Sequence, residues 1–143
     1  MSVEHILAEK GRDTVTITPD KTLADVVDML SRHRIGAVVV VDGDRTVRGI
    51  LSERDVVKAL AESGAEALAE PVSRRMSTEV ATCSATDAVP ALMAVMTEGK
   101  FRHIPVVEGG RLGGMVSIGD LVKHRLAEME AEHKALRDYI ATA

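Results

Sequence analysis

Apolar residues follow two spacings along the chain, one typical of helices and one typical of strands. The first helical set recurs at intervals of three and four residues and comprises Leu23, Val26, Val27 and Leu30. This spacing predicts a helix, and Thr22 and Asp25 stand where a capping pair belongs. The run Ile35–Val41 is too short for a helix and rich in valine, so it predicts a buried strand.

Turn and capping residues divide the rest of the first half. Asp42-Gly43-Asp44 predicts a tight turn between strands, and Ser52 stands at a helix N-cap position. The elements predicted around them are the strands Thr14–Thr18 and Thr46–Leu51 and the helix Glu53–Ser63, which ends at Gly64. The first unit therefore has the order strand, helix, strand, strand, helix.

The second half repeats this order after a linker, Ala65–Arg75. Its predicted elements are the strand Val80–Ser84, the helix Val89–Thr97, the strands Phe101–Val107 and Leu112–Val116, and a helix from Gly119. Pro90 would fall in the first helical turn, where a missing N–H costs little. Gly109-Gly110 fits a hairpin turn and lacks the G-x-G-x-x-G spacing of a dinucleotide-binding loop.

A short motif indicates that the two halves are copies of one unit. Gly49-Ile50-Leu51-Ser52-Glu53-Arg54-Asp55 recurs 65 residues later as Gly114-Met115-Val116-Ser117-Ile118-Gly119-Asp120. The shared pattern is Gly, two apolar residues, Ser, two variable residues and Asp. Upstream of the motif the register is 66 residues, so that Leu30 pairs with Met96. An internal repeat of this kind predicts two similar units that share one core.

The composition supports one compact molecule. A chain of 143 residues fits one domain or two very small half-domains, and 45% apolar content can build a core. The core must be aliphatic, because Phe101 and Tyr139 are the only aromatic residues. Each half would be marginal alone because small domains bury too little surface, so we expect the halves to pack on each other.

Charge and cysteine content exclude several classes of protein. A formal net charge of −4 argues against a nucleic-acid partner, which needs a basic face. Cys83 is the sole cysteine, which excludes an intrachain disulfide and favours a reducing cytoplasm. Met1–Lys10 is unlike a signal peptide, and the longest apolar run, Ala37–Val41, is far shorter than a membrane span. We therefore expect a cytoplasmic protein that binds neither nucleic acid nor membrane.

The last helix carries an apolar stripe that extends beyond the repeat. The stripe steps by three and four residues and comprises Leu126, Met129, His133, Leu136 and Ile140. It either docks on its own domain or pairs with a second copy of the chain. The second alternative is favoured because a stripe that runs past the core needs something to cover it.

Both copies of the motif place Ser and Asp three residues apart at a predicted strand-to-helix junction. Free N–H groups and the positive end of the helix dipole meet there, which favours an anion. An Asp one turn into the helix can also accept hydrogen bonds from two vicinal hydroxyl groups, as in ribose. The alternative is purely structural: Ser caps the helix and Asp neutralises its dipole. Two copies in equivalent positions favour a ligand site.

The two units resemble a pair of cystathionine-β-synthase (CBS) domains, together called a Bateman module. The resemblance rests on the two Gly-apolar-apolar-Ser-x-x-Asp segments, on Arg102-His103-Ile104-Pro105-Val106-Val107 and on Ile35-Gly36-Ala37-Val38-Val39-Val40. It implies an α/β fold of two pseudo-twofold-related repeats packed sheet to sheet. It also implies a regulatory role, homodimers in which two pairs form a flat disc, and clefts that bind AMP, ADP, ATP, NAD or S-adenosylmethionine.

The resemblance also implies boundaries and site residues. Residues 1–13 would form an N-terminal arm, 14–64 the first repeat, 65–78 a linker, 79–126 the second repeat and 127–143 a C-terminal helix extension. One cleft would be lined by Ser52, Arg54, Asp55, Met76, Ser77, Thr82, Arg102, His103 and Ile104. The other would be lined by Lys10, Gly11, Thr16, Gly36, Ala37, Val38, Ser117 and Asp120. Strand backbone would bind the adenine, and each Asp the ribose.

The two predicted clefts differ in charge. Arg102 and His103 either begin a solvated strand or contact a ligand phosphate, and Arg54 on the opposite side favours the phosphate contact. In the other cleft Gly36 and Ala37 stand at the positions equivalent to Arg102 and His103. We therefore expect the second cleft to accept a less charged or bulkier adenosine ligand, such as NAD, or to remain empty.

The remaining candidate residues are interpreted as structural. Cys83 is expected to be a small core residue of the strand Val80–Ser84, because no basic residue stands beside it. The lone histidines His5, His33, His124 and His133 show no metal-ligand spacing and are expected at the surface.

The sequence therefore predicts a non-catalytic regulatory module that binds an adenosine nucleotide, with AMP as the first candidate. It carries no nucleophile–base pair, metal cluster or phosphate-transfer loop. Two alternatives remain open: a structural adaptor whose clefts bind nothing, and a small nucleotide hydrolase that uses Asp55 or Asp120. The sequence does not identify the protein that such a module would regulate.

Overall fold

Two small β-sheets lie at the centre of the protein, one in each half. The structure is a computed structural model that describes residues 2–142. The first sheet has the order β1-β2-β3 and the second consists of the antiparallel pair β4-β5. The strands are β1 (Thr16–Ile17), β2 (Ala37–Val41), β3 (Val47–Ser52), β4 (His103–Glu108) and β5 (Arg111–Ser117). The predicted mixed α/β class is confirmed.

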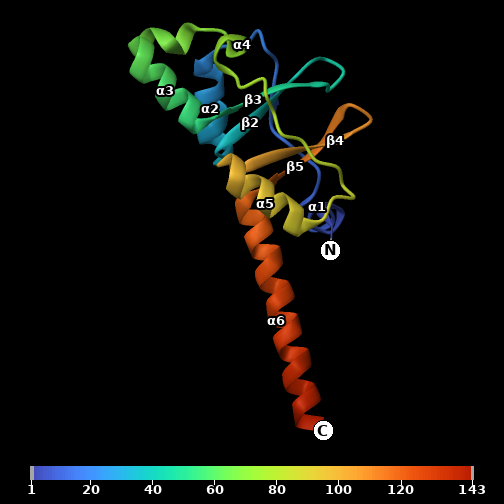
Figure 1. The fold of residues 1–143 in the computed structure, drawn as a ribbon. Coiled ribbons are helices and arrows are strands. Elements are labelled where there is room, and N and C mark those ends of the chain that lie inside the picture. Colours follow the sequence, from blue (N-terminus) through green and yellow to red (C-terminus); the bar gives the residue numbers. More distant parts are fainter. Residues whose placement is uncertain (1, 143) are drawn as a thin grey trace.

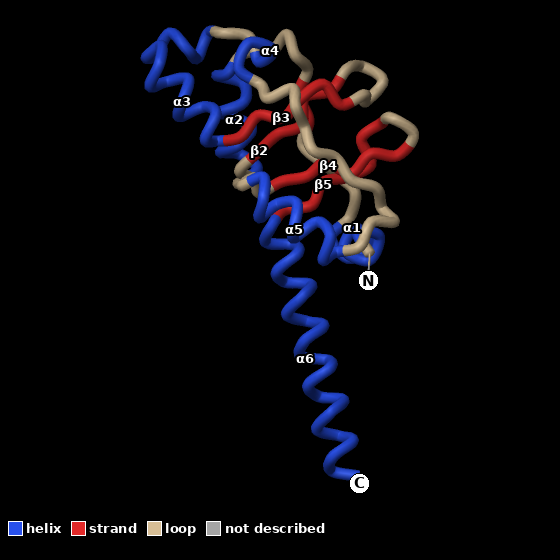
Figure 2. The backbone as a smooth tube through the Cα atoms, in the orientation of Figure 1, coloured by secondary structure: helices blue, strands red, loops and turns tan. Residues whose placement is uncertain are grey.

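Helices cover both sheets (Figures 1 and 2). They are α1 (Val3–Lys10), α2 (Leu23–His33), α3 (Glu53–Ser63), the 3₁₀ helix η1 (Gly64–Ala69), α4 (Val72–Arg75), α5 (Val89–Gly99) and α6 (Ile118–Thr142). The capping pair predicted for α2 is present, because Thr22 accepts a hydrogen bond from the Asp25 backbone and Asp25 bonds back to Thr22. None of the helices in the described residues is long and apolar enough to cross a membrane.

The predicted strand Val80–Ser84 does not form. Only Cys83 pairs there, in an isolated parallel bridge with Val106. The Cys83 N–H donates to the Pro105 carbonyl at 3.0 Å, and the Cys83 carbonyl accepts from the Val107 N–H at 2.8 Å. Cys83 is nevertheless a core residue, as predicted, and burial raises the pKa of its thiol to about 11. A single pair of hydrogen bonds fixes this segment without making it a strand.

The segment predicted as a linker is ordered and completes the core of the first repeat. η1 buries Ala67 and α4 buries Val72 in one cluster with Leu23, Val26 and Leu51. Its polar side chains are fixed as well: the Arg75 guanidinium forms ion pairs with Glu62 and Glu70. The hydrogen bond from Arg75 holds the pKa of Glu70 below its ordinary value. Residues after α3 therefore belong to the fold of the first repeat.

The N-terminal arm is a helix, and it packs on the second repeat rather than the first. Val3, Ile6 and Leu7 of α1 are buried in the cluster that contains Val89 and Leu121. The α1 backbone is also tied to this half, because the N–H groups of residues 3 and 4 donate to carbonyls of residues 87 and 85. The N-terminal helix α1 thus completes the hydrophobic core of the second repeat.

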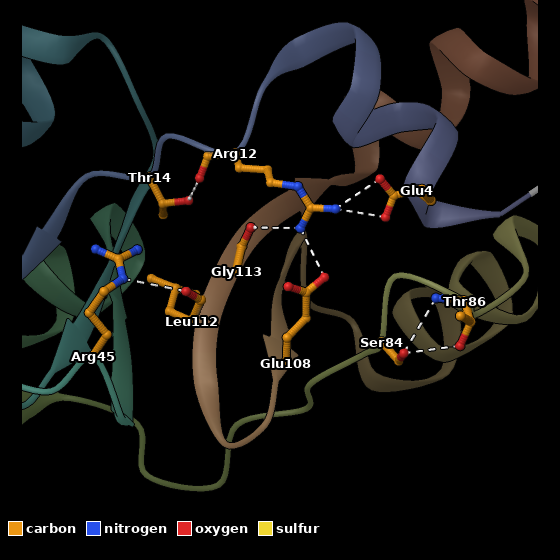
Figure 3. A network of polar contacts seen from close by, with 9 residues as sticks. All are labelled: Glu4, Arg12, Thr14, Arg45, Ser84, Thr86, Glu108, Leu112 and Gly113. Carbon is orange, nitrogen blue, oxygen red and sulfur yellow. Dashed lines mark hydrogen bonds and ion pairs between the residues drawn. The ribbon is translucent and has the colours of Figure 1, made fainter.

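Arg12 fixes the chain where it leaves α1 (Figure 3). Its guanidinium lies 2.7 Å from a Glu4 carboxylate oxygen and 2.9 Å from Glu108. It therefore connects α1 to the β4–β5 hairpin. The same view shows a contact between the halves, where Arg45 donates from its side chain to the Leu112 carbonyl at 3.4 Å.

The two halves share an apolar contact between their sheets. Val39 and Val41 of β2 form one buried cluster with Leu112 of β5, and Val47 and Met115 pack against it. The Leu112 N–H also donates to the Arg45 carbonyl at 2.9 Å. The sheets therefore face each other, as the sequence predicts for two marginal halves.

The long helix α6 begins in the second repeat and then leaves the body of the molecule (Figure 1). From residue 129 to residue 142 every side chain is exposed. The prediction of surface histidines fails at one position on this helix. His124 is 10% exposed and faces α1, and its Nε2 atom lies 3.5 Å from Glu128.

Candidate functional site

The first copy of the Ser-x-x-Asp motif joins β3 to α3. Asp55 accepts two hydrogen bonds at Oδ2, from the Ser52 N–H at 2.8 Å and from the Ser52 hydroxyl at 3.0 Å. The Asp55 N–H in turn donates to Ser52 Oγ at 3.3 Å. This is a complete capping box, so the structural role considered for these residues is present. It occupies one carboxylate oxygen of Asp55 and leaves the other free for a ligand.

A cavity of about 270 Å³ opens above this junction, between the two repeats. We call it the Asp55 cleft. It is lined by Gly36, Ala37, Ile50, Ser52, Glu53, Arg54, Asp55, Ser77, Glu79, Val80, Ala81, Lys100, Phe101, Arg102 and His103. Its wall therefore combines the β3–α3 junction of the first repeat with two segments of the second repeat. One is the extended arm before residue 83, and the other is the entry to β4.

Both positive and negative side chains line the Asp55 cleft. Arg54, Lys100 and Arg102 are exposed side chains and can turn toward an anion. Glu53 and Glu79 add two carboxylates that suit hydroxyl or amine donors. The wall therefore offers cations for phosphate oxygens and acceptors for a sugar.

His103 occupies the middle of the molecule, between the two copies of the motif. Burial lowers the pKa of its imidazole, and the charge of Lys10 lowers it further. Its ring lies against Gly36, where a Cβ atom would be 3.4 Å from His103 Cε1. His103 is therefore a half-buried neutral hydrogen-bonding group near neutral pH, rather than a further cation.

The structure gathers most of the residues predicted for the first cleft, with three exceptions. Met76 is half-buried against the core of the first repeat, and Ile104 is buried in the core of the second. Thr82 is exposed but does not line the cavity. The side chains of Met76 and Ile104 face the core because apolar groups at these positions complete the two hydrophobic clusters.

Sequence reasoning missed several wall residues, including Glu53, Glu79 and Phe101. Phe101 is half-buried at the entry to β4, packs against the core of the second repeat and adds an aromatic side chain to the cleft lining. A signal for it existed, because it is the only aromatic residue within the two repeats. Glu79 carried no such signal, since it lies in an irregular segment that no repeat pattern predicts.

The second copy of the motif has the same caps but a different neighbour. The Ser117 N–H donates to Asp120 Oδ2 at 2.8 Å, and the Asp120 N–H donates to Ser117 Oγ at 3.1 Å. The ammonium of Lys10, at the end of α1, also lies 2.7 Å from Asp120 Oδ2 and donates to the Met115 carbonyl at 2.9 Å. Burial raises the pKa of Asp120, but the hydrogen bonds and charge of Lys10 outweigh burial and hold it below its ordinary value.

The residues predicted for the second cleft lie in different parts of the structure. Gly36 and Ala37 line the Asp55 cleft instead, because β2 pairs with β3 directly beside Ser52. Val38 is fully buried, and Thr16 lies at a separate hollow beside α2. Gly11 follows α1 with a positive φ of 90° and ends that helix. Only Lys10, Ser117 and Asp120 come together.

This geometry defines a two-repeat α/β module with a polar cleft between its halves, and the comparisons with known proteins agree. The family model of the CBS domain matches residues 4–62 and 70–127. The chain therefore belongs to the CBS domain family, as a CBS pair, which is a regulatory module. Among the described residues no group of three His, Cys, Asp or Glu side chains could hold a metal ion.

Related proteins with this fold occur in bacteria and plants. A CBS-domain-containing protein of known structure from Agrobacterium tumefaciens is 48% identical, with a TM-score of 0.84, over 87% of this chain and 99% of that one. A mitochondrial CBS domain-containing protein of Arabidopsis thaliana is 31% identical, in an alignment that covers 97% of this chain and 71% of the relative. The CBS pair of protein MJ0100 was crystallised with 5′-methylthioadenosine and S-adenosyl-L-methionine. It is 22% identical, with a TM-score of 0.80, and shares the fold.

Proposed function

We propose that this protein is a non-catalytic regulatory module that binds an adenosine nucleotide in the Asp55 cleft. The observation that carries the proposal is the arrangement at the β3–α3 junction. One oxygen of Asp55 is held by Ser52, Asp55 lines a cavity of about 270 Å³, and exposed cationic side chains line the same cavity. The ligands in the MJ0100 structure are both adenosine compounds and support the same ligand class here.

The cleft suggests how each part of such a ligand would be held. Asp55 would accept hydrogen bonds from the two ribose hydroxyls. Arg54 and Arg102 would bind the phosphate, because planar guanidinium donors can engage two phosphate oxygens at once. The adenine would lie against Phe101 and hydrogen-bond to backbone at the entry to β4. AMP matches these three contacts best, with ADP, ATP and NAD as larger alternatives.

The active form is proposed to be a homodimer. Several large apolar side chains on the helices stay exposed in the single chain, among them Val57, Leu126 and Ile140. Patches of this kind on a helical surface mark interaction sites. A regulatory module needs two conformations that bind the ligand with different affinity. Two arrangements of the subunits in a dimer can provide them. The protein that reads this difference is a further partner.

Isothermal titration calorimetry tests the ligand site. Wild-type protein is expected to bind AMP, and Asp55→Ala is expected to weaken binding about tenfold or more because hydrogen bonds to a charged group are lost. The matched control is Asp25→Ala, which removes the same capping residue from α2 but not from the cleft. If Asp55→Ala and Asp25→Ala bind AMP with equal affinity, Asp55 only caps α3 and does not bind the ligand.

Two other measurements separate the alternatives. A structural adaptor without ligands predicts that no adenosine nucleotide raises the melting temperature, whereas a binding module predicts a rise by mass action. A nucleotide hydrolase predicts that the added nucleotide is consumed during incubation. Mass spectrometry of the gently purified protein identifies any nucleotide that remains bound.

A further inference from the structure

The helix α6 presents two different faces to its surroundings. Its first half rests on the second repeat and on α1 through Leu121, His124 and Glu128, of which Leu121 is fully buried. The opposite face carries apolar residues that nothing in the chain covers. They are Val122, Leu126, Met129, Leu136 and Ile140, between 43% and 64% exposed. The helix therefore docks with one face and leaves an apolar seam on the other.

The spacing of this seam is that of a coiled coil. Together with His133 its members alternate strictly by four and three residues from residue 122 to residue 140. The average period is 3.5 residues, which lets two helices keep one seam in contact by supercoiling. In heptad notation Leu126, His133 and Ile140 are a positions, and Val122, Met129 and Leu136 are d positions. The second half of the seam lies beyond the body of the molecule (Figure 1).

We propose that α6 pairs with α6 of a second copy in a parallel, in-register, two-stranded coiled coil. This inference rests on the proposed homodimer and specifies how the dimer is built. The charges beside the seam fit this arrangement, because residues at g and e positions of neighbouring heptads meet across a parallel pair. Arg125 then faces Glu130 of the partner subunit, and Glu132 faces Arg137 of the partner subunit. Symmetry doubles both attractive contacts.

An antiparallel pair over the same seam brings like charges together. Matching Val122 with Ile140 of the partner aligns all six core positions in opposite directions. In that alignment Glu130 meets Glu130 of the partner, and Lys123 meets Arg137 of the partner. Repulsion between these like charges disfavours the antiparallel orientation. The charge pattern therefore favours the parallel pair.

A parallel coiled coil also determines how the bodies face each other. Its twofold axis runs along α6, so each repeat must face the same repeat of the partner. The helices α2, α3 and α5 lie on the same side of the strands as the start of α6 (Figure 1). Val57, Leu60 and Val95 on α3 and α5 are exposed and would be covered by their own counterparts in the partner.

Cysteine cross-linking tests the orientation on the full-length protein. In a parallel pair, Ile140→Cys places two thiols opposite each other at an a position, within disulfide reach. Mild oxidation is expected to link most Ile140→Cys chains into dimers on a non-reducing gel. The matched control is Asp138→Cys, two residues away on the outer face of the helix, which is expected to link far less. The wild-type protein, whose single cysteine Cys83 is buried, gives the background level of cross-linking.

Each outcome of this experiment has a distinct meaning. A monomer by light scattering at micromolar concentration overturns the proposed homodimer and this inference with it. A dimer in which Ile140→Cys links no better than Asp138→Cys overturns the parallel coiled coil but leaves the homodimer in place. Ligand binding at the Asp55 cleft is measured separately and is decided by neither result.

A charge-reversal series gives independent evidence. Glu132→Lys alone and Arg137→Glu alone are each expected to weaken the dimer about tenfold, because two symmetric attractive contacts become repulsive. The double variant restores the attraction and is expected to regain the wild-type dimer affinity in analytical ultracentrifugation. The two residues are five positions apart, so they are not neighbours on one helix. Failure of the double variant to recover contradicts the parallel register.

Discussion

Asp55 and Asp120 occupy equivalent places in two copies of one motif, yet their surroundings differ. Both end a strand-to-helix junction, and both bond back to the serine three residues earlier. Asp55 faces an open cleft, and no cation among the described residues reaches it. Asp120 is bound by the ammonium of Lys10 at 2.7 Å. A residue outside the motif, Lys10, therefore accounts for the difference between the two aspartates.

The difference originates in the segment that precedes each repeat. Counted by the repeat register of 66, Lys10 is equivalent to Met76. Met76 ends α4 and packs its thioether beside Gly49, where a Cβ atom would lie 2.9 Å from Met76 Sδ. It therefore turns toward the core and leaves Asp55 uncovered. Lys10 has a longer, charged side chain and reaches the carboxylate of the other copy.

The largest expected effect concerns phosphate recognition in the Asp55 cleft. Arg102→Ala is expected to weaken AMP binding about tenfold to a hundredfold, since hydrogen bonds to a charged group are lost. Adenosine lacks the phosphate, so its affinity is expected to change little. Calorimetry with both ligands measures the ratio, and Arg48→Ala, on β3 outside the cleft, is the control. Equal losses for AMP and adenosine contradict a phosphate role for Arg102.

The next expected effect concerns the difference between Asp55 and Asp120. Lys10→Ala removes the ammonium from Asp120 and is expected to create a second, weaker adenosine site. The number of ligands bound per chain is expected to rise from one toward two in calorimetry. Lys123→Ala is the matched control, because Lys123 lines the same hollow without contacting Asp120. An unchanged stoichiometry in Lys10→Ala shows that Lys10 is not what closes this site.

A smaller effect separates helix capping from ligand binding. Ser52→Ala and Ser117→Ala each remove an N-cap, so each is expected to lower the free energy of unfolding by about 1 kcal/mol. Only Ser52→Ala is expected to weaken nucleotide binding as well, because Ser52 holds the aspartate of the open cleft. Urea denaturation and calorimetry measure the two quantities. A loss of affinity in Ser117→Ala contradicts the difference between the clefts.

The smallest effect is a pH dependence at His103. Burial, helped by Lys10, holds its pKa below the ordinary value of about 6.5, so the unfolded chain binds a proton first as the pH falls. The free energy of unfolding is therefore expected to decrease as the pH falls through about 6.5, and to stop decreasing below the pKa of the folded state. His103→Gln removes this slope in urea denaturation at several pH values, whereas His33→Gln, at an exposed site, leaves it.

Local patterns predicted the regular elements well and the arrangement between them less well. The helices α2, α3 and α5 and the strands β2 to β5 lie within two residues or so of the predicted ranges, because apolar spacing and caps are local signals. The N-terminal arm was not predicted as a helix, since its apolar residues are few and become buried only against the second repeat, mainly β5 and α6. The linker helices were missed for a similar reason.

The candidate site was likewise predicted only in part. Ser52 and Asp55 were found from the repeat, and Arg102 and His103 from the family resemblance; the structure brings all four to one cavity. The Lys10–Asp120 contact joins residues 110 positions apart. The family resemblance placed Lys10, Ser117 and Asp120 in one cleft, but it did not predict that the Lys10 ammonium binds the Asp120 carboxylate. That contact depends on the packing of α1 against the second repeat, which no pattern within either repeat describes.

The packing of α1 on the second repeat has a consequence for synthesis on the ribosome. The main core cluster of the first repeat can form once α4 and Met76 have emerged, since all its members precede residue 77. Val3, Ile6 and Leu7 leave the ribosome earlier, yet their partners include Val116 and Leu121. These three apolar side chains therefore stay unburied until the chain has been synthesised beyond Leu121. The α1 segment is thus synthesised well before the residues that bury it and reaches its final packing late.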